Sequence, residues 1–346
     1  MQDSPLAELR EAAAGAIQDW AAARAADPLS EVYRWALLPP GKLLRPLLLL
    51  ASARAVGGRC EQVLPAAVGV ELAHVASLLH DDIIDGDDRR RGRAAVHQRY
   101  GAAAAILGGD CLSFALFQQL GACRRRGVPD PLIADAMEIA AAVVQGAARG
   151  VAREIALSGP AARSGEPDDA DRVAAYLEMV RLKTATPLSA TCRIGVTLAG
   201  GDPRCADLLA AYGEALGIAF QIHDDLLPYT PGCAADKPPA SDLRNQRPAL
   251  PLLLARQRGT PADRALLAAL ASGGGDERER QDAARRLVRD TGALDQAQHM
   301  LGQYLGRCRR ATAWVPAGHG RDILTELPSI LLDAPGDPHP AQPAPA

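Results

Sequence analysis

The chain has 346 residues, of which 48% are hydrophobic and only 3% are aromatic. Alanine and leucine dominate, and because both are strong helix formers this composition predicts a helical protein with a large apolar core. The formal net charge of −3 argues against nucleic acid as the main partner, since proteins that bind the phosphate backbone usually present a basic face.

Cysteine content and the length of apolar runs indicate a cellular location. The seven cysteines are an odd number without a CxxC pair, which is typical of reduced thiols rather than of a disulfide framework. The N-terminal stretch opens with acids and a proline, and it lacks the basic stretch and apolar core of a secretory signal. Apolar runs such as 46–53 are too short to span a bilayer. We therefore expect a cytoplasmic protein with no integral membrane segment.

Helical periodicity extends from about residue 5 to residue 333, with apolar positions three and four residues apart. The clearest helices are 6–26 and 169–201, and the second ends in Gly200-Gly201. No alternating strand pattern of useful length appears. We expect one all-α domain over residues 1–333, a single large helical bundle around a central cavity, and a disordered Pro/Ala-rich tail at 334–346. Helix breaks are expected at Gly57-Gly58, Gly108-Gly109, 127–129, 158–160 and 228–242.

The first cluster of interest follows the apolar helix predicted over 61–86, where a group of aspartates precedes a block of arginines. Asp81 and Asp85 are four residues apart and share a helix face, with Asp82 rotated off it by about 100°. Two carboxylates at that spacing can bind a hard cation such as Mg²⁺. His74 lies about two turns earlier on the same face. A lone DDxxD is more often a solvated turn at a helix end, so this cluster needs support from elsewhere.

A second apolar helix, over 211–229, also ends in an aspartate pair. Gly213, Gly217 and Gln221 form one stripe that leads to Asp224 and Asp225. A glycine inside a helix costs about 0.5–1 kcal/mol relative to alanine, so the room that it leaves has a use, either a ligand or close helix packing. Two helices that each end in an aspartate pair can build a carboxylate-rimmed cavity with an apolar interior.

Scattered cations form the third element of the pattern. Lys42 and Arg45 lie three residues apart at a helix start, where free backbone N–H groups also favour anions. Each cation alone is best explained as a solvated surface residue. Together they match a site for phosphate groups, since Mg²⁺ commonly binds through a few carboxylates and substrate phosphates. The other candidates are Arg90, Arg91, Lys183, Lys237 and Arg247.

These segments, in this order, resemble the trans-type isoprenyl diphosphate synthases of the polyprenyl synthetase family. The matching motifs are GKLLRP, ELAHVASLLHDDIID with RRRG, RLKTATP, FQIHDDLL and KPPASDLRNQRPALPLLLA, and they cover residues 10 to 330. The joint match is specific, whereas each piece alone is weak. The resemblance implies the all-α isoprenoid synthase fold and a homodimer.

The resemblance also implies an activity and a set of roles. The enzyme would be a transferase that condenses isopentenyl diphosphate with an allylic diphosphate, with Mg²⁺ as cofactor and Mn²⁺ as a possible substitute. The absence of bulky aromatics at Ala76 and Ser77 implies a product of geranylgeranyl length or longer, and Phe114 and Phe117 are the nearest aromatic candidates for a floor below the growing chain. The implied metal ligands are Asp81, Asp82, Asp85, Asp224 and Asp225. The residues implied to bind isopentenyl diphosphate are Lys42, Arg45, His74 and Arg91. Those implied to bind the allylic diphosphate are Arg90, Lys183 and Lys237, with Arg247 as a further cation. Thr184 and Gln221 are implied to lie near the reacting carbons.

Two positions depart from the family pattern. Pro228 stands where the second motif usually ends in aspartate, and Arg247 stands where lysine is usual. The first two aspartates of that motif are intact, which favours a working metal site, and Arg247 keeps the charge but not the geometry of lysine. Because proline lacks an N–H, the helix is predicted to end near residue 228.

Two other functions fit parts of the pattern. A class I terpene cyclase also ionises an allylic diphosphate with Mg²⁺ in an all-α fold, but it has no second diphosphate to hold, so Lys42, Arg45 and His74 count against it. A catalytically silent partner subunit of a heteromeric synthase would be expected to lose more aspartates than the single one missing here. Chain elongation is the favoured function.

Overall fold

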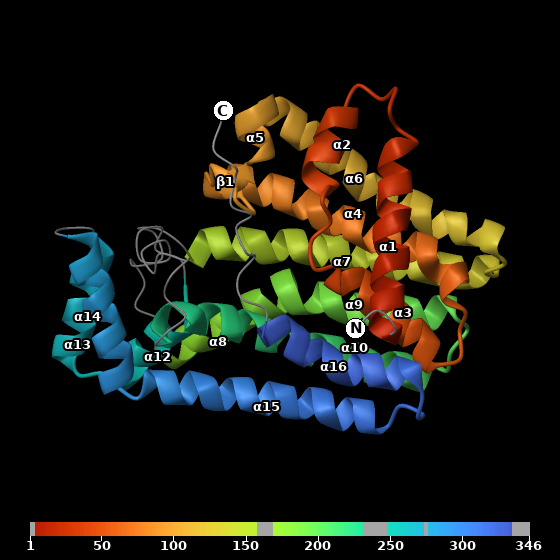
Figure 1. Cartoon of the computed structure of the whole chain (residues 1–346). Helices are drawn as coiled ribbons and strands as arrows, with labels where there is room; N and C mark the ends of the chain where they lie inside the picture. Colours follow the sequence, from red (N-terminus) through yellow and green to blue (C-terminus); the bar gives the residue numbers. More distant parts are fainter. Residues whose placement is uncertain (1–3, 158–168, 231–247, 273–275, 334–346) are drawn as a thin grey trace. The chain divides into compact units, whose positions relative to one another are not determined.

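The computed structural model describes residues 4–157, 169–230, 248–272 and 276–333. They fold almost entirely into helices (Figure 1), which confirms the all-α prediction. The first part of the chain forms α1 (Pro5–Ala22), α2 (Ser30–Leu37), α3 (Leu44–Ala55), α4 (Cys60–Asp85), β1 (Arg89–Arg90), β2 (Arg93–Ala94), α5 (Val96–Tyr100), α6 (Ala102–Ala122) and the 3₁₀ turn η1 (Cys123–Arg126).

The rest of the described chain is also helical, and it includes a π-helical turn and a second 3₁₀ turn. Its elements are α7 (Asp130–Leu157), α8 (Asp169–Val180), the π turn η3 (Arg181–Ala185), α9 (Thr186–Leu198), α10 (Pro203–Leu226), the 3₁₀ turn η4 (Leu227–Tyr229), α12 (Leu250–Arg258), α13 (Pro261–Ser272), α14 (Glu277–Asp290), α15 (Ala293–Ala313) and α16 (His319–Asp333).

The chain divides into two compact units. Unit 1 contains Met1–Ala141, Ala190–Ala210 and Thr312–Ala346, and unit 2 contains Ala142–Ser189 and Ala211–Ala311. Helices α7, α9, α10 and α15 each contribute residues to both units. The prediction of a single domain over 1–333 remains a prediction, and the tail at 334–346 lies outside the described residues.

Unit 1 is built around α3, which is apolar on every side over residues 47–50. Leu47 is 3% exposed and Leu48, Leu49 and Leu50 are 0% exposed, as expected for a helix that is hydrophobic all round and therefore buried. Small residues let neighbouring helices approach its backbone. A Cβ on Gly195 of α9 would lie 2.3 Å from the Leu49 carbonyl oxygen. Helices α1, α4 and α16 also pack against α3.

Unit 2 has its own apolar core, which surrounds the end of α10. Ile218, Ile222 and Leu226 of α10 pack with Tyr176 of α8, and residues of α12, α14 and α15 complete the cluster. The side chains on α10 recur at four-residue spacing, so one face of this helix is buried along its length. The polar residues of the second aspartate motif project from the end of the same helix.

Most of the predicted helix ends are confirmed, with one exception. Breaks occur at Gly57-Gly58 and at residues 127–129, and α10 ends at Leu226 before the predicted turn. The predicted break at Gly108-Gly109 is wrong because α6 continues through both glycines. A Cβ on Gly109 would lie 2.3 Å from Nε2 of His80, so the glycine serves close packing rather than a turn. Residues 158–160 lie outside the described part of the chain.

Four of the described helical segments are long and apolar enough, by length and composition alone, to cross a membrane. They start at Cys60, Ala102, Asp130 and Pro203, with mean hydropathies from 1.2 to 1.5 over their most apolar windows. The expectation that all apolar runs are too short is therefore wrong for these helices. The windows in α4 and α10 are 61% buried inside the protein, so both serve as core helices.

Candidate active site

The first aspartate cluster lies at the C-terminal end of α4. The helix ends at Asp85, and Gly86 follows in the left-handed conformation, with φ of +65°, which is the usual glycine cap. Asp81 and Asp85 are partly exposed and one turn apart. Their spacing and exposure make a pair of oxygen ligands available on one side of the helix.

Asp82 has a different environment from its two neighbours. It is 3% exposed, and Nε of Arg90 donates a hydrogen bond of 2.8 Å to its Oδ1. Burial raises the pKa of the Asp82 carboxyl, and the Arg90 guanidinium opposes that effect. The structure therefore gives Asp82 a partner in Arg90, while its role as a metal ligand remains a prediction.

Arg90 and Arg91 belong to a short hairpin, residues 89–94, which the sequence did not indicate. β1 and β2 pair antiparallel, with Arg90 opposite Arg93. The connecting residues Arg91 and Gly92 have φ of +50° and +72°, as in a type I′ turn. Strands of two residues are too short for an alternating pattern, which is why periodicity missed them.

A basic cluster forms where the hairpin, the start of α3 and the middle of α4 meet. It joins Arg45, His74 and Arg91, three of the residues predicted for the isopentenyl diphosphate site, to the buried Glu71. Burial lowers the pKa of His74 well below its ordinary value, and the positive charges of Arg45, Arg91 and Arg90 lower it further. Nδ1 of His74 is buried without a hydrogen-bond partner. His74 is therefore neutral beside these cations.

Glu71 is a member of this cluster that the sequence reading missed. It is 4% exposed, and burial raises its pKa while the charges of Arg45 and Arg91 oppose the shift. Its signal was present, because a lone acid stood in an apolar helix three residues before His74. The loop before α3 completes the cluster. A Cβ on Gly41 would lie 2.5 Å from Nη2 of Arg91, so the neighbouring exposed Lys42 is next to the same guanidinium.

The glycine stripe of α10 is explained by close packing inside unit 2. A Cβ on Gly217 would lie 2.5 Å from Cα of Ala185, and one on Gly213 would lie 2.6 Å from the Leu188 carbonyl oxygen. These glycines let η3 and the start of α9 approach the α10 backbone. π turns inside helices are frequent at functional sites, and η3 carries both Lys183 and Thr184.

The close approach creates a polar network around the second aspartate pair. Asp225 is 7% exposed, and it accepts hydrogen bonds from Tyr176 Oη at 2.6 Å, Gln221 Nε2 at 3.0 Å and the Leu250 backbone N–H at 2.8 Å. Thr184 Oγ1 donates to Oε1 of Gln221 at 3.3 Å. The structure thus brings together three predicted residues, Thr184, Gln221 and Asp225. Tyr176 was missed, and nothing in its local sequence distinguished it.

The remaining predicted residues of unit 2 are distributed as follows. Lys183 forms an ion pair with Glu154 of α7, a partner that lies 29 residues away and that the sequence did not indicate. Asp224 is partly exposed on the last turn of α10. Lys237 and Arg247 lie outside the described residues, so their predicted roles remain predictions.

Pro228 lies in η4, directly after α10, which confirms that the helix ends there. The residue is buried, and its carbonyl oxygen accepts a hydrogen bond of 2.9 Å from Nε of Arg285 in α14. The family's usual aspartate at this position is thus replaced by a residue that joins the packing of η4 against α14.

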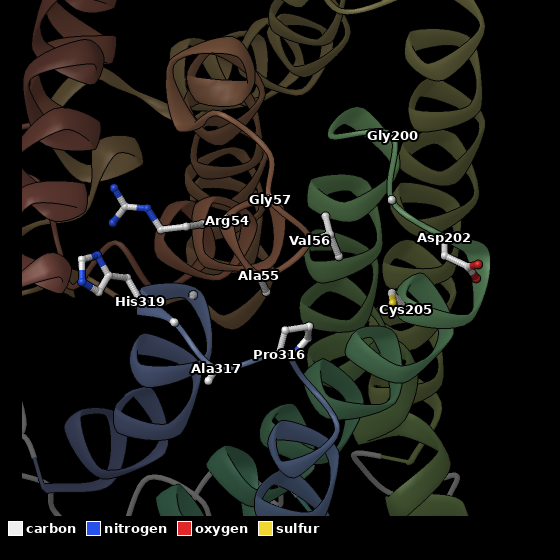
Figure 2. A pocket seen from close by; sticks show the side chains of 13 residues that line it. Arg54, Ala55, Val56, Gly57, Gly200, Asp202, Cys205, Pro316, Ala317 and His319 are labelled. Atoms are coloured by element: carbon white, nitrogen blue, oxygen red, sulfur yellow. The ribbon is translucent and has the colours of Figure 1, made fainter.

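A cavity of about 600 Å³ in unit 1 lies apart from all of these residues (Figure 2). It is bounded by the end of α3 with Arg54 and Val56, by the turn before α10 with Asp202, and by the start of α16 with His319. Arg45 lies at the opposite end of α3, nine residues or roughly 14 Å from Arg54 along the helix. None of the predicted site residues lines this cavity.

The described side chains fit a metal ion only if the substrate supplies part of its coordination. Within the described ranges, no three His, Cys, Asp or Glu side chains are gathered closely enough to hold an ion. Asp81, Asp85 and Asp224 are partly exposed, and carboxylate oxygens are ligands that Mg²⁺ prefers. Mg²⁺ typically uses one or two carboxylates together with substrate phosphates. The carboxylates of each motif therefore suit an ion that arrives with a diphosphate.

Comparisons with known proteins point to one family. The sequence model described as Polyprenyl synthetase matches residues 26–288. The chain is 35% identical over 300 residues to the geranylfarnesyl diphosphate synthase of Aeropyrum pernix, covering 85% of this chain and 89% of that protein. It is 33% identical over 280 residues to the geranylgeranyl diphosphate synthase of Methanosarcina mazei, covering 81% of each.

Solved structures give the same answer for the fold. The polyprenyl synthase of Caulobacter crescentus CB15, solved in complex with calcium and isoprenyl diphosphate, superimposes with a TM-score of 0.80 at 29% identity. The superposition covers 96% of this chain and 97% of that one. Both the fold and the order of the motifs therefore agree with the resemblance read from the sequence.

Proposed function

Because the chain belongs to the polyprenyl synthetase family, we propose that it is a prenyltransferase that condenses isopentenyl diphosphate with an allylic diphosphate. The observation that carries this proposal is the basic cluster of unit 1. There Arg45, Arg91 and the adjacent Lys42 outnumber the one buried carboxylate of Glu71, and His74 adds no charge. Such a surplus of positive charge suits a ligand that brings several negative charges.

We propose Mg²⁺ as the metal, with Mn²⁺ as a substitute, held by Asp81, Asp85 and Asp224. These residues offer oxygen ligands only, and hard cations prefer oxygen. When bound, Mg²⁺ would act as a Lewis acid that stabilises the charge on the departing diphosphate. The relative from Caulobacter crescentus, crystallised with calcium and isoprenyl diphosphate, supports a divalent ion in this role.

The buried aspartates are proposed to position other groups. Asp82 orients Arg90 toward the allylic diphosphate, and Asp225 orients Gln221, which in turn is bonded to Thr184. Glu154 holds Lys183 in place for the same diphosphate. Fixed charges of this kind stabilise a leaving group without reorganisation during the reaction. The allylic cation that forms needs a dry apolar surrounding, because water would quench it.

We propose a product of geranylgeranyl length or longer. A chain whose diphosphate is bound near Asp81 has to extend along α4 toward the N-terminus of the helix. Ala76 and Ser77, one turn back, are small, and Ser77 is exposed on the face that carries Asp81, so neither of these two side chains is large enough to block the chain. Phe114, one of the two aromatic candidates for a floor, is 71% exposed. Phe117 is half-buried and remains a candidate.

Chain elongation is favoured over the two alternatives. A terpene cyclase binds one diphosphate and does not need the basic cluster of unit 1 for a second one. A silent partner subunit would not need two intact aspartate pairs. In this chain both pairs are intact, and the buried member of each accepts hydrogen bonds. The named relatives are chain-elongating synthases, which also supports elongation.

We further propose a cytoplasmic homodimer. None of the cysteines within the described residues forms a disulfide, which suits a reducing compartment. On α6, Ile106, Leu107 and Phe114 are 45%, 56% and 71% exposed, and large exposed apolar patches commonly mark protein interfaces. Sedimentation of the Leu107→Glu variant, expected to be monomeric, would test the interface.

Steady-state kinetics with both substrates tests the proposed function. Arg45→Gln should raise the KM for isopentenyl diphosphate about 10- to 100-fold, because a charge-assisted contact of roughly 1.5–3 kcal/mol is lost. Its KM for the allylic primer should change little, whereas Lys183→Gln should affect mainly the allylic substrate. Equal effects of Arg45→Gln on both substrates would show that the two diphosphate sites are wrongly assigned.

A further inference from the structure

We propose that Trp35 and Arg93 are positioning residues for the reaction, because they fasten the 89–94 hairpin to the loop of residues 38–43. This contact would hold Arg91 beside Gly41 and Lys42 and so keep the basic cluster assembled. The inference rests on the proposed function for the identity of the ligand, isopentenyl diphosphate. The contacts that carry it all lie within unit 1.

Trp35 contacts the hairpin through its indole N–H and through the face of its ring. Nε1 of Trp35, on α2, donates a hydrogen bond of 3.0 Å to the carbonyl oxygen of Ala94. The Arg93 guanidinium carbon lies 3.6 Å from the centroid of the Trp35 ring, within the range of a cation–π contact. Nη1 of the same Arg93 guanidinium donates a hydrogen bond of 2.7 Å to the carbonyl oxygen of Leu38. Arg93 thus connects the second hairpin strand to the first residue of the 38–43 loop.

A second arginine covers the same ring. The guanidinium carbon of Arg99, on α5, lies 3.9 Å from the Trp35 centroid, and Tyr100 meets the indole edge-on at 6.3 Å. Trp35 is therefore held by α5 as well as by the hairpin. A ring contacted by two guanidiniums and bonded through its N–H has little rotational freedom, so it can fix the position of what it touches.

The hairpin needs such support. Two strands of two residues are not stable alone in water, and Arg91 adopts a positive φ of +50°, which is unfavourable for a residue with a long side chain. Backbone conformations of this kind persist only where the surroundings over-determine them. Asp82 holds the hairpin through Arg90, and Trp35 holds it through Arg93 and Ala94.

Three neighbouring arginines of the hairpin each contact a different part of unit 1. Arg90 contacts Asp82, Arg91 contacts the backbone at Gly41, and Arg93 contacts Trp35 and Leu38. Loss of the Trp35 contact should therefore leave the Asp82 attachment in place and release mainly the turn with Arg91. The expected consequence is weaker binding of isopentenyl diphosphate, with little effect on the allylic substrate or on the chemical step.

The first experiment measures the hairpin itself by amide hydrogen exchange. In Trp35→Leu, a peptide covering residues 87–96 should exchange faster than in the wild-type protein, while the N-terminal turns of α4 exchange as before. Arg24→Gln is the matched control, because Arg24 stacks on Trp20 at 3.7 Å in the same unit without touching the hairpin. Unchanged exchange of the hairpin in Trp35→Leu would overturn the proposal.

The second experiment measures the kinetics of the same variants beside Arg45→Gln. We expect Trp35→Leu and Arg93→Gln each to raise the KM for isopentenyl diphosphate about tenfold with kcat nearly unchanged, which is the signature of lost substrate binding. The double variant should be little worse than either single one, since the two residues act together. Trp35→Phe, which keeps a ring for Arg93, should recover part of the affinity.

These results separate a failure of the inference from a failure of the proposed function. If Arg45→Gln raises the KM for isopentenyl diphosphate but Trp35→Leu leaves it unchanged, the positioning role is wrong and the pocket assignment stands. If Arg45→Gln has no selective effect, the pocket assignment is wrong, and the exchange data alone decide whether Trp35 fixes the hairpin. A lower Tm of Trp35→Leu with an unchanged KM would mean that the contact is only structural.

Discussion

The two members of each aspartate pair differ in burial, and they differ in the same way in both pairs. In each pair the second aspartate is buried, and its oxygens accept hydrogen bonds from neighbouring donors: Asp82 from Arg90, and Asp225 from Tyr176, Gln221 and the Leu250 N–H. The first member, Asp81 or Asp224, is partly exposed. A buried carboxylate without its donors would be costly, so the buried members hold the local structure, and the partly exposed members are the ones that we propose as metal ligands.

This difference in burial predicts different outcomes for the two aspartates of the second pair. Asp224→Asn should reduce kcat by orders of magnitude and lower the free energy of unfolding less than Asp225→Asn does, because Asp224 is partly exposed and Asp225 is buried. Asp225→Asn should lower the free energy of unfolding by about 1–3 kcal/mol, because an amide nitrogen would face donors that need an acceptor. Denaturant unfolding and steady-state kinetics with both substrates, measured on both variants, check this. A strongly destabilised Asp224→Asn would contradict the assignment.

The low pKa of His74 predicts a pH dependence of stability. Burial and nearby arginines lower its pKa in the folded state, so below about pH 6.5 the unfolded chain binds a proton that the folded chain does not. The free energy of unfolding should therefore fall with decreasing pH, by up to about 1.4 kcal/mol per pH unit from this residue. His74→Gln should flatten the curve below pH 6.5. Parallel curves for the variant and the wild-type protein would contradict it.

At the level of elements, long periodic helices were predictable and close contacts were not. The helix over 61–86 was predicted almost to its ends because its apolar run stops at Asp85-Gly86. The hairpin was missed because its strands are two residues long. Gly108-Gly109 was wrongly predicted as a helix break. Gly109 leaves room for the His80 ring, and the sequence alone does not distinguish such a glycine from one that ends a helix. Glu154 and Tyr176 were missed because their partners are distant in sequence.

The packing of α10 against η3 predicts a sharp effect of one methyl group. In Gly217→Ala the new Cβ would lie 2.5 Å from Cα of Ala185, which is too close for two carbon atoms. The π turn η3, which carries Thr184, therefore has to shift. We expect a loss of about 1–3 kcal/mol in stability and a clear drop in kcat. Gly302→Ala is the control, because that glycine is exposed in α15 with no atom within 4 Å of its Cβ position. Equal behaviour of the two variants in unfolding and turnover would contradict this account.

The open face of α4 predicts how product length can be changed. Ser77→Phe places an aromatic ring one turn before Asp81, on the face along which the chain is proposed to extend. We expect the main product to become shorter while total turnover is largely kept. Chromatography of the products from wild-type and variant enzyme is the measurement. An unchanged product distribution would show that the chain does not extend along this face.

At the level of the whole molecule, each compact unit carries some of the proposed site residues. Unit 1 holds the basic cluster and the first aspartate motif, and unit 2 holds Lys183 and the second motif. The family could be predicted from the joint order of the motifs, since that order covers nearly the whole chain. The division of the chain into units could not, because α7, α9, α10 and α15 run through its boundaries without a change in composition.

The central claim is that this chain lengthens an allylic diphosphate with isopentenyl diphosphate in a metal-dependent reaction. The most direct test is mass spectrometry of the products formed from farnesyl diphosphate and isopentenyl diphosphate with Mg²⁺, with a chelator-treated control. We expect linear allylic diphosphates of geranylgeranyl length or longer with Mg²⁺, and none with the chelator. Unchanged primer with Mg²⁺ present, or a cyclised hydrocarbon formed without isopentenyl diphosphate, would contradict it.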